Sequence, residues 1–233
     1  MAAPYAEWRG PAENPGALPD IAALQALVQR LGIARDTPVV VVHAGADPTD
    51  MGTATRVYWT LKSLGVADLA VLNGGLAGWT EAGLPTAAPA VVAPSTFAPE
   101  LSDKWRITTA EIAAMVDSGE AARLVDARPA GFFEGVQWSI ARPGTIRGAE
   151  SFTFERWFEG DAMVDAARAR AIALDNGLTD APLTVSFCNT GHWASINWFA
   201  LSELADVDNV RLYAESMPNG LRPAARSTMH RAE

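Results

Sequence analysis

The sequence predicts an α/β fold built from two similar modules, each a parallel sheet flanked by helices, with the first module lacking its N-terminal part. Three observations predict it. Amphipathic helical segments alternate with short apolar runs. These runs lack the polar alternation of a strand with one wet face, so both faces of each sheet are expected to be covered. The two halves of the 233 residues also carry a faint internal repeat.

The expected helices show apolar residues at about a 3.6-residue period. Residues 21–28 and 112–116 each place their apolar side chains on one face, and Thr108 with Glu111 has capping-box spacing ahead of the second helix. Five short apolar runs are the expected strands: Val39 to Val42, Leu69 to Leu72, Leu124 to Asp126, Leu183 to Phe187 and Val210 to Tyr213.

The internal repeat relates YAEWRGPAENPGALPDIAALQALVQRLGI to FERWFEGDAMVDAARARAIALDNGL, with Asp20 matching Asp165. Further along the chain, VVVHAG aligns with VSFCNT, ATRVYWTL with ASINWFAL, and AVLNGGLAGW with RLYAESMPNG. We expect Ala44, next to His43, to stand where the second copy has Cys188. The first copy would then have no nucleophile.

The two copies are unequal in length, which sets the expected domain boundaries. A Pro- and Ala-rich stretch reads as a linker, so we expect a first domain over 1–86, a linker over 87–104 and a second domain over 105–233. The stretch from LSDKWRITTA to RPGTIRGAE has no counterpart in the first copy. The first module is therefore expected to be short of a strand, with the native N-terminus upstream or another segment covering the gap.

Composition limits the classes of function. With 49% hydrophobic and 19% charged residues and no apolar run of the roughly 20 residues that a membrane span needs, we expect a soluble globular protein with no membrane partner. It would be cytoplasmic, or periplasmic if an upstream signal is missing, and the Ala-rich, Lys-poor composition is typical of a bacterial source. A net charge of −9 disfavours nucleic acid. One cysteine excludes an internal disulfide and a cysteine-rich zinc site, and no metal or cofactor is expected.

The single cysteine lies in SFCNTGHWASINW, between an apolar run and a polar loop. Cys188 is followed by Asn189, Thr190 and Gly191, and a helix is expected to begin near Ala194. A tight strand–loop–helix turn points successive backbone N–H groups at the loop centre, which favours an anion and therefore the nucleophilic thiolate. The alternative interpretation is that the cysteine is a small buried hydrophobe at the end of a core strand.

Several motifs resemble those of a known family. LVDARPAGFFEG, RPGTIRGAE and SFCNTGHWAS, followed by a helix and VRLYAESM, resemble the successive signatures of a rhodanese domain. VYWTLKSLGV followed by VLNGGLAGW is similar to the inactive N-terminal module of tandem-domain sulfurtransferases. The resemblance covers nearly the whole chain and implies two rhodanese-like domains and a sulfurtransferase of the thiosulfate or 3-mercaptopyruvate type.

The resemblance also implies a mechanism. Cys188 would take a sulfane sulfur from a small anionic donor, thiosulfate or a related compound, and form a persulfide. It would then pass the sulfur to a thiophilic acceptor, either cyanide or a thiol. The residues expected to hold the anion are Asn189, Thr190, Gly191, His192, Trp193, Ala194, Asp126, Arg128, Arg142 and Ser216.

Four of these residues lie outside the loop. Arg128 matches the arginine of the family's DxR motif, with Asp126 orienting it or the loop, and the alternative is an ordinary ion pair at a strand end. Ser216 stands in the family's Gly-Ser-Trp type segment and is expected to contact the ligand. Arg142 and Arg147 precede a turn that the family places at the pocket mouth, where each is equally well explained as a surface charge.

Two loop residues have alternative roles. His192 is expected either to donate a hydrogen bond to a bound anion or to point away from the pocket, and Trp193 to pack or to form the pocket wall. Asn189 and Thr190 stand where thiosulfate-preferring relatives carry basic residues, so the donor stays open.

Two other functions compete with sulfur transfer. A noncatalytic rhodanese-like binding or regulatory module would keep the scaffold without turnover. A cysteine phosphatase would need an arginine six residues after the cysteine, and Ala194 stands there, which leaves the charge of a phosphoryl transition state uncompensated.

Overall fold

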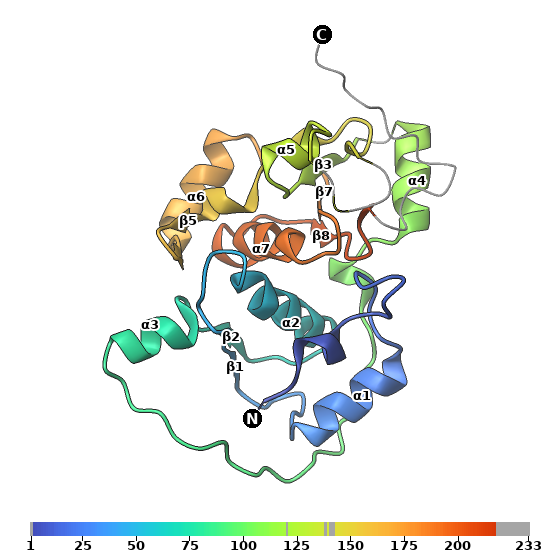
Figure 1. Cartoon of the computed structure of the whole chain (residues 1–233). Coiled ribbons are helices and arrows are strands. Elements are labelled where there is room, and N and C mark those ends of the chain that lie inside the picture. Colours follow the sequence, from blue (N-terminus) through green and yellow to red (C-terminus); the bar gives the residue numbers. More distant parts are fainter. Residues whose placement is uncertain (1, 120, 138, 140–142, 218–233) are drawn as a thin grey trace.

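The computed structural model describes residues 2–119, 121–137, 139 and 143–217. Figure 1 shows two halves, the first in blue to teal and the second in green to red, joined by an extended segment that runs around the outside of the first. The first half contains η1 (Tyr5–Trp8), α1 (Ile21–Arg30), β1 (Val39–Val41), α2 (Met51–Ser63), β2 (Leu69–Val71) and α3 (Gly75–Glu81).

The second half is larger. Its elements are η2 (Asp103–Trp105), α4 (Thr109–Ser118), β3 (Arg123–Asp126), α5 (Ala130–Phe133), β4 (Glu150–Ser151), η3 (Phe154–Trp157), β5 (Phe158–Glu159), β6 (Ala162–Met163), α6 (Ala166–Asp175), β7 (Thr184–Phe187), α7 (Trp193–Phe199), the π-helical turn η4 (Ala200–Leu204) and β8 (Val210–Leu212). Among the helices described, none is both long and apolar enough to cross a membrane.

The predicted α/β class with parallel sheets is confirmed. In the second half, four strands pair in the order β4-β3-β7-β8, all parallel, and in the first half β1 pairs parallel with β2. Each of the five expected apolar runs forms one of the strands β1, β2, β3, β7 and β8. The two-residue strands β4, β5 and β6 were not expected, since such short segments carry no periodicity.

Helix starts follow the capping residues in the sequence. The Asp20 carboxylate accepts a hydrogen bond from the Ala23 amide at 2.7 Å at the start of α1, and Asp165 accepts from the Arg168 amide at 2.8 Å at the start of α6. Thr108 closes the predicted capping box ahead of α4. These side chains satisfy amides that the first helical turn leaves without partners.

The same succession of elements occurs in both halves. A 3₁₀ turn, an Asp-capped helix, a strand, a second helix and a second strand appear as η1-α1-β1-α2-β2 and again as η3-α6-β7-α7-β8, with the β5–β6 hairpin inserted. The boundaries of the two domains stay a prediction.

The register of the strands corrects one match within the repeat. The Cys188 carbonyl accepts from the Met217 amide beyond β8, and the equivalent bond beyond β2 runs from the Leu76 amide to the carbonyl of His43. The prediction that Ala44 matches Cys188 is therefore wrong, because His43 occupies that place. The alignment of VVVHAG with VSFCNT also sets His43 opposite Cys188, so the predicted match was one residue away from it.

The outer edge of β1 has no strand beside it in the described part of the chain, whereas the matching β7 has β3. Val40 and Val42 are 59% and 48% exposed there. A groove of about 360 Å³ follows this strand, lined also by Tyr5 and Trp8. In the described part of the chain the first sheet is thus narrower than the second.

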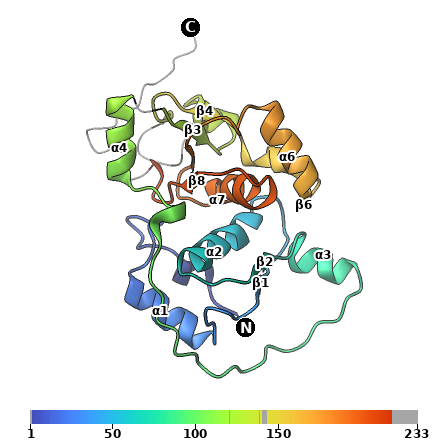
Figure 2. The same cartoon turned by 180° about the vertical axis from the view of Figure 1, so that it is seen from behind.

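The two halves meet where α2 packs against α7, between the two sheets (Figures 1 and 2). Ala54 and Ala194 are fully buried there and let the helices approach closely. The Thr55 Oγ1 and Ser195 Oγ atoms lie 2.8 Å apart in the buried contact. Because the repeat matches ATRVYWTL with ASINWFAL, each helix presents equivalent positions to the other, as in a two-fold interface.

The Thr55–Ser195 hydrogen bond is expected to stabilise the contact between the halves. Thr55→Val keeps the shape and removes one partner of the Ser195 hydroxyl, which still donates to the His192 carbonyl at 2.7 Å, so we expect the free energy of unfolding to fall by about 0.5 to 1.5 kcal/mol. A double-mutant cycle with Ser195→Ala, measured by urea denaturation, should show a favourable coupling energy. Strictly additive losses would mean that the two hydroxyls do not interact.

Candidate functional site

Cys188 lies at the carboxyl end of β7, an inner strand of the second sheet, and is 1% exposed. Its amide donates to Ser216 Oγ at 3.1 Å, and its carbonyl accepts from the Met217 amide at 3.2 Å. The Ser216 hydroxyl donates to the Tyr213 carbonyl at 2.8 Å, and its φ of +54° is left-handed. The segment after β8 therefore fixes the backbone of the cysteine, and Ser216 contacts that backbone directly.

The Cys188 loop, residues 188–192, turns tightly into α7. Gly191 has a φ of +70°, and a Cβ there would lie 2.4 Å from both the Ala214 carbonyl oxygen and Arg56 Nη1, so only glycine fits. The backbone amides of residues 189–193 have no protein acceptor within the described part of the chain. Successive free amides in a tight turn are the donors that an anion needs.

Asp126 and Arg128 form a buried ion pair beside this loop, 0% and 1% exposed. The Arg128 Nε and Nη2 atoms donate to the two carboxylate oxygens of Asp126 at 2.8 and 2.6 Å. Arg128 also donates from Nη1 to Asn189 Oδ1 at 3.1 Å and from Nη2 to the Gly144 carbonyl at 2.8 Å, and Thr145 donates to Asp126 at 2.7 Å. The pair thus holds Asn189, which goes beyond an ordinary strand-end ion pair.

The side chains of Trp193 and Ala194 pack within the protein. The Trp193 ring stacks on Phe154, with centroids 5.3 Å apart and planes 5° apart, and meets Phe132 edge-on at 5.8 Å. Ala194 is fully buried in the contact between α2 and α7. Their side chains set the start of α7, and so the end of the loop.

His192 is hydrogen-bonded to the first half of the chain. Its Nε2 lies 2.8 Å from the Thr49 carbonyl and therefore donates, which leaves Nδ1 to accept from the Tyr5 hydroxyl at 2.9 Å. Arg9 donates from Nη1 to the Tyr5 oxygen at 2.8 Å and from Nη2 to the Thr190 carbonyl at 2.9 Å. Both nitrogens of His192 are used within the protein, so neither is available to a bound anion in this conformation.

This chain of hydrogen bonds requires a neutral imidazole. Burial lowers the pKa of His192 to about 4, and the nearby Arg9 and Arg56 guanidiniums add to the shift against the hydrogen bond to Thr49. Burial also raises the pKa of the Tyr5 phenol, so it stays a donor at neutral pH. The ring fits because residue 52 is glycine, where a Cβ would lie 2.6 Å from the imidazole.

The matching loop of the first half, residues 43–50, contains its own anion. Asp50 Oδ2 accepts from the Gly45 amide at 2.7 Å and the Ala46 amide at 3.3 Å, and lies 3.2 Å from His43 Nδ1. Burial raises the pKa of Asp50, but the hydrogen bonds from Gly45, His43 and Ala46 outweigh it and lower the pKa overall. A carboxylate thus fills this loop.

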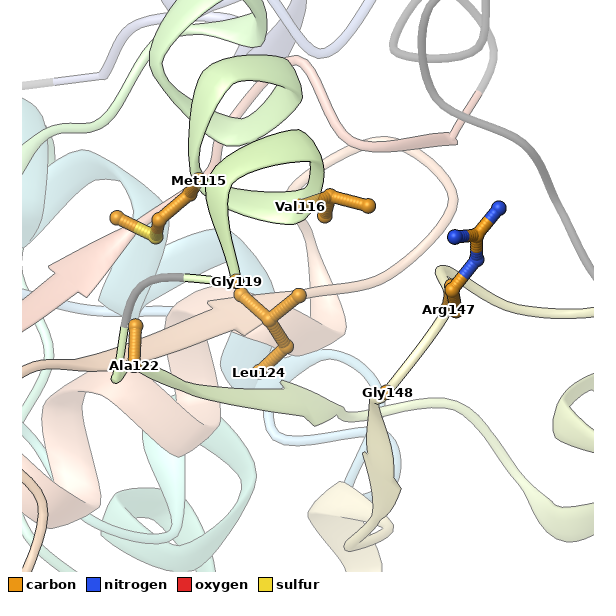
Figure 3. A pocket seen from close by; sticks show the side chains of 7 residues that line it. All are labelled: Met115, Val116, Gly119, Ala122, Leu124, Arg147 and Gly148. Atoms are coloured by element: carbon orange, nitrogen blue, oxygen red, sulfur yellow. The ribbon is translucent and has the colours of Figure 1, made fainter.

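The two arginines expected at the pocket mouth have different outcomes. Arg142 lies outside the described residues. Arg147 lines a separate pocket of about 240 Å³ with Met115, Val116 and Leu124, between α4 and the strands β3 and β4. Figure 3 shows Arg147 across this pocket from Met115. In this arrangement Arg147 belongs to a pocket that Cys188 does not line.

Sequence reasoning missed the residues that the first half brings to the Cys188 loop: Tyr5, Arg9 and Arg56. One signal was present for Arg56. The repeat matches it with Ile196, which is 0% exposed, and a charge at the place of a buried aliphatic residue needs an explanation.

No family model matches the chain. A putative thiosulfate sulfurtransferase of Synechococcus elongatus is 29% identical over 91% of this chain and 68% of its own length. The thiosulfate sulfurtransferase of Gallus gallus is 36% identical over 59% of this chain and 47% of its own. The 3-mercaptopyruvate sulfurtransferase of Escherichia coli K12 is 30% identical over 85% of this chain and 70% of its own. The chain belongs to the thiosulfate and 3-mercaptopyruvate sulfurtransferase family.

Solved structures show the same fold. The crystal structure of SseA from Escherichia coli, described as a rhodanese fold of 3-mercaptopyruvate sulfurtransferases, has a TM-score of 0.78 at 22% identity, over 92% of this chain and 80% of that chain. A variant of EanB in complex with ergothioneine has a TM-score of 0.83 at 22% identity, over 98% of this chain. This member of the sulfurtransferase family spans 59% of the length of that EanB chain. The predicted rhodanese fold is confirmed.

Protonation of His192 is expected to weaken the fold in acid. Its pKa is depressed from 6.5 to about 4, so the unfolded chain binds the proton first as the pH falls. The stabilisation is complete above pH 6.5 and is lost toward pH 4, a loss of about 2 to 3 kcal/mol in the free energy of unfolding at pH 4.5. Urea denaturation at pH 7 and pH 4.5 measures it.

The control is His192→Gln, because carboxylates elsewhere in the chain titrate over the same pH range and also change the free energy of unfolding. Its free energy of unfolding should depend less on pH than that of the native chain. An identical pH dependence in both proteins would show that His192 does not contribute.

Proposed function

We propose that this chain is a sulfurtransferase that carries a sulfane sulfur as a persulfide on Cys188. The observation that supports it best is the Cys188 loop, where the chain's one thiol stands at the end of a central strand and the amides of residues 189–193 have no protein acceptor among the described residues. The family provides the reaction class. Thiolate and persulfide are both anions, so the same amides serve both states.

The reaction has two steps, and each conserves atoms and charge. The Cys188 thiolate attacks the outer sulfur of thiosulfate, the S–S bond of thiosulfate breaks, and its electron pair leaves with sulfite. Cys188 is left as an anionic persulfide. An acceptor such as cyanide then attacks the terminal sulfur, takes it as thiocyanate, and the electron pair of the broken bond restores the thiolate.

The other predicted site residues hold the loop in place. Arg128, oriented by Asp126, fixes Asn189, while Ser216 fixes the Cys188 backbone. Gly191 permits the turn. Preorganised donors of this kind need no rearrangement when charge develops.

Thiosulfate is the first donor to test, since two of the relatives carry its name. The second candidate is 3-mercaptopyruvate. The Escherichia coli relative is named for it, and Asn189 and Thr190 bring no charge for a dianion. A donor with one carboxylate needs less positive charge than thiosulfate does.

We propose that the two domains have different roles. Residues 1–86 form a noncatalytic domain, residues 87–104 a linker and residues 105–233 the catalytic domain. His43 stands where the thiol would be, and the Asp50 carboxylate occupies the donors of that loop. An anionic sulfur donor that entered this loop would be repelled by the Asp50 carboxylate.

Sulfur loading is tested by intact-mass measurement. The protein is mixed with thiosulfate, or in a parallel sample with 3-mercaptopyruvate, and freed of excess reagent. A mass gain of one sulfur atom is expected, with loss of that gain on addition of cyanide. Cys188→Ser should gain nothing, because oxygen at this position forms no persulfide.

Two outcomes would overturn the proposal. If neither donor adds sulfur to the native protein, the noncatalytic binding module is the better description. If the protein hydrolyses an aryl phosphate in a Cys188-dependent way and loads no sulfur, the cysteine phosphatase is the better description. The parallel samples also decide between the two donors.

A further inference from the structure

Arg56 of α2 is a buried cation without a carboxylate partner. Its side chain is fully buried. Nη2 donates to the Gly16 and Ala17 carbonyls at 2.7 and 3.2 Å, and the guanidinium lies 5.0 Å from the centre of the Trp59 ring. Its Nε and Nη1 have no hydrogen-bond partner among the described residues. A buried charge in this state is costly unless an anion compensates it.

The unused Nη1 is directed at the Cys188 loop. It lies 2.4 Å from the place where a Cβ on Gly191 would be, so the guanidinium contacts the bare backbone of that residue. Any larger residue at position 191 would push it away. The contact between α2 and α7 therefore brings the free end of Arg56 to the middle of the loop that begins at Cys188.

The other cations around this loop already have partners. Arg9 donates to Pro15, Tyr5 and Thr190 oxygens. Arg106 pairs with carboxylates at 3.1 and 3.7 Å. Among the cations around this loop, within the described part of the chain, Arg56 alone has side-chain donors without a partner.

Four titratable groups act on the charge of Arg56 and limit which anion can compensate it. They are Tyr5, Arg9, Arg106 and Cys188. Burial lowers the pKa of Arg56 to about 10, the two arginines add to the shift, and attraction to the Tyr5 phenolate and the Cys188 thiolate opposes it. Tyr5 is a neutral donor at pH 7, since burial raises its pKa. Arg56 stays charged, and Cys188 is the remaining group of this set that can form an anion.

We propose that Arg56, from the half without a nucleophile, is a positioning residue that stabilises the anionic forms of Cys188 across the Gly191 backbone. For the thiolate this stands on the contact of the unpartnered Arg56 Nη1 with the Gly191 backbone and on the attraction between Arg56 and Cys188. For the persulfide it rests on the proposed function. The guanidinium supplies from another helix the positive charge that Asn189 and Thr190 do not supply from the loop.

Alkylation of Cys188 by iodoacetamide measures the thiolate without any sulfur transfer. In the full-length protein, Arg56→Gln should lower the second-order rate constant at pH 7 about tenfold, the effect of weakening one charge contact by about 1.4 kcal/mol. The native and variant rates should converge at pH 10. Arg56→Lys keeps the charge and should recover most of the rate. Lys62→Gln removes a cation from the same helix, one paired with Glu203, and should change nothing.

An equal rate at pH 7, or the same fold-change at both pH values, would overturn the proposal, because a purely structural role alters access to the thiol and not its ionisation. A protein that loads no sulfur but shows the Arg56 effect would refute the proposed function alone. Sulfur loading with no effect of Arg56→Gln on alkylation would refute this inference alone.

A second measurement needs no variant at Arg56, in case Arg56→Gln does not fold. Native protein is alkylated on Cys188 with iodoacetate or with iodoacetamide, which give adducts of nearly equal size that differ by one negative charge. The anionic adduct should have the higher Tm, because it compensates Arg56. The opposite order, or equal Tm values, would contradict the proposal.

Discussion

The packing of α2 against α7 is the contact on which the rest of the structure depends. Two alanines allow the helices to approach, and the hydroxyls of Thr55 and Ser195 meet at the centre. Because α7 starts directly after the Cys188 loop, whatever fixes α7 also fixes the loop. The first half of the chain thus contributes to the site through the position of a helix and not through a nucleophile of its own.

The electrostatics of the site follow from this arrangement. An anion on Cys188 is far from water, at 1% exposure, so it needs donors that are already in place. The loop amides are one set, held by Arg128 through Asn189 and by Ser216 at the cysteine backbone. The first half keeps His192 neutral and uses both of its ring nitrogens, so His192 is not one of the donors to the anion. Uncharged loop residues are compatible with anion chemistry when the positive charge comes from elsewhere.

Much of the fold was predictable from local patterns. The five strands are runs of apolar residues, the helix starts have capping side chains, and Cys188 stands out as the one thiol next to a tight turn. The contribution of Tyr5 and Arg9 was not predictable, because contacts between the two halves leave no periodicity in the sequence. For Arg56 the repeat carried one signal, its match with the buried Ile196. The match of Cys188 with His43 could have been predicted, since the alignment of VVVHAG with VSFCNT sets the two residues opposite each other.

The Asp50 carboxylate in the loop of the first half has a consequence for anyone who would engineer this chain. The Asp50 side chain occupies this loop as a covalently tethered inhibitor would occupy an enzyme pocket. Its effective concentration there is one that no free donor can match. Installing a thiol at His43 would therefore create a second cysteine but no second site. The carboxylate must be removed as well, and the vacated amides would then lack the anion that now holds the loop in shape.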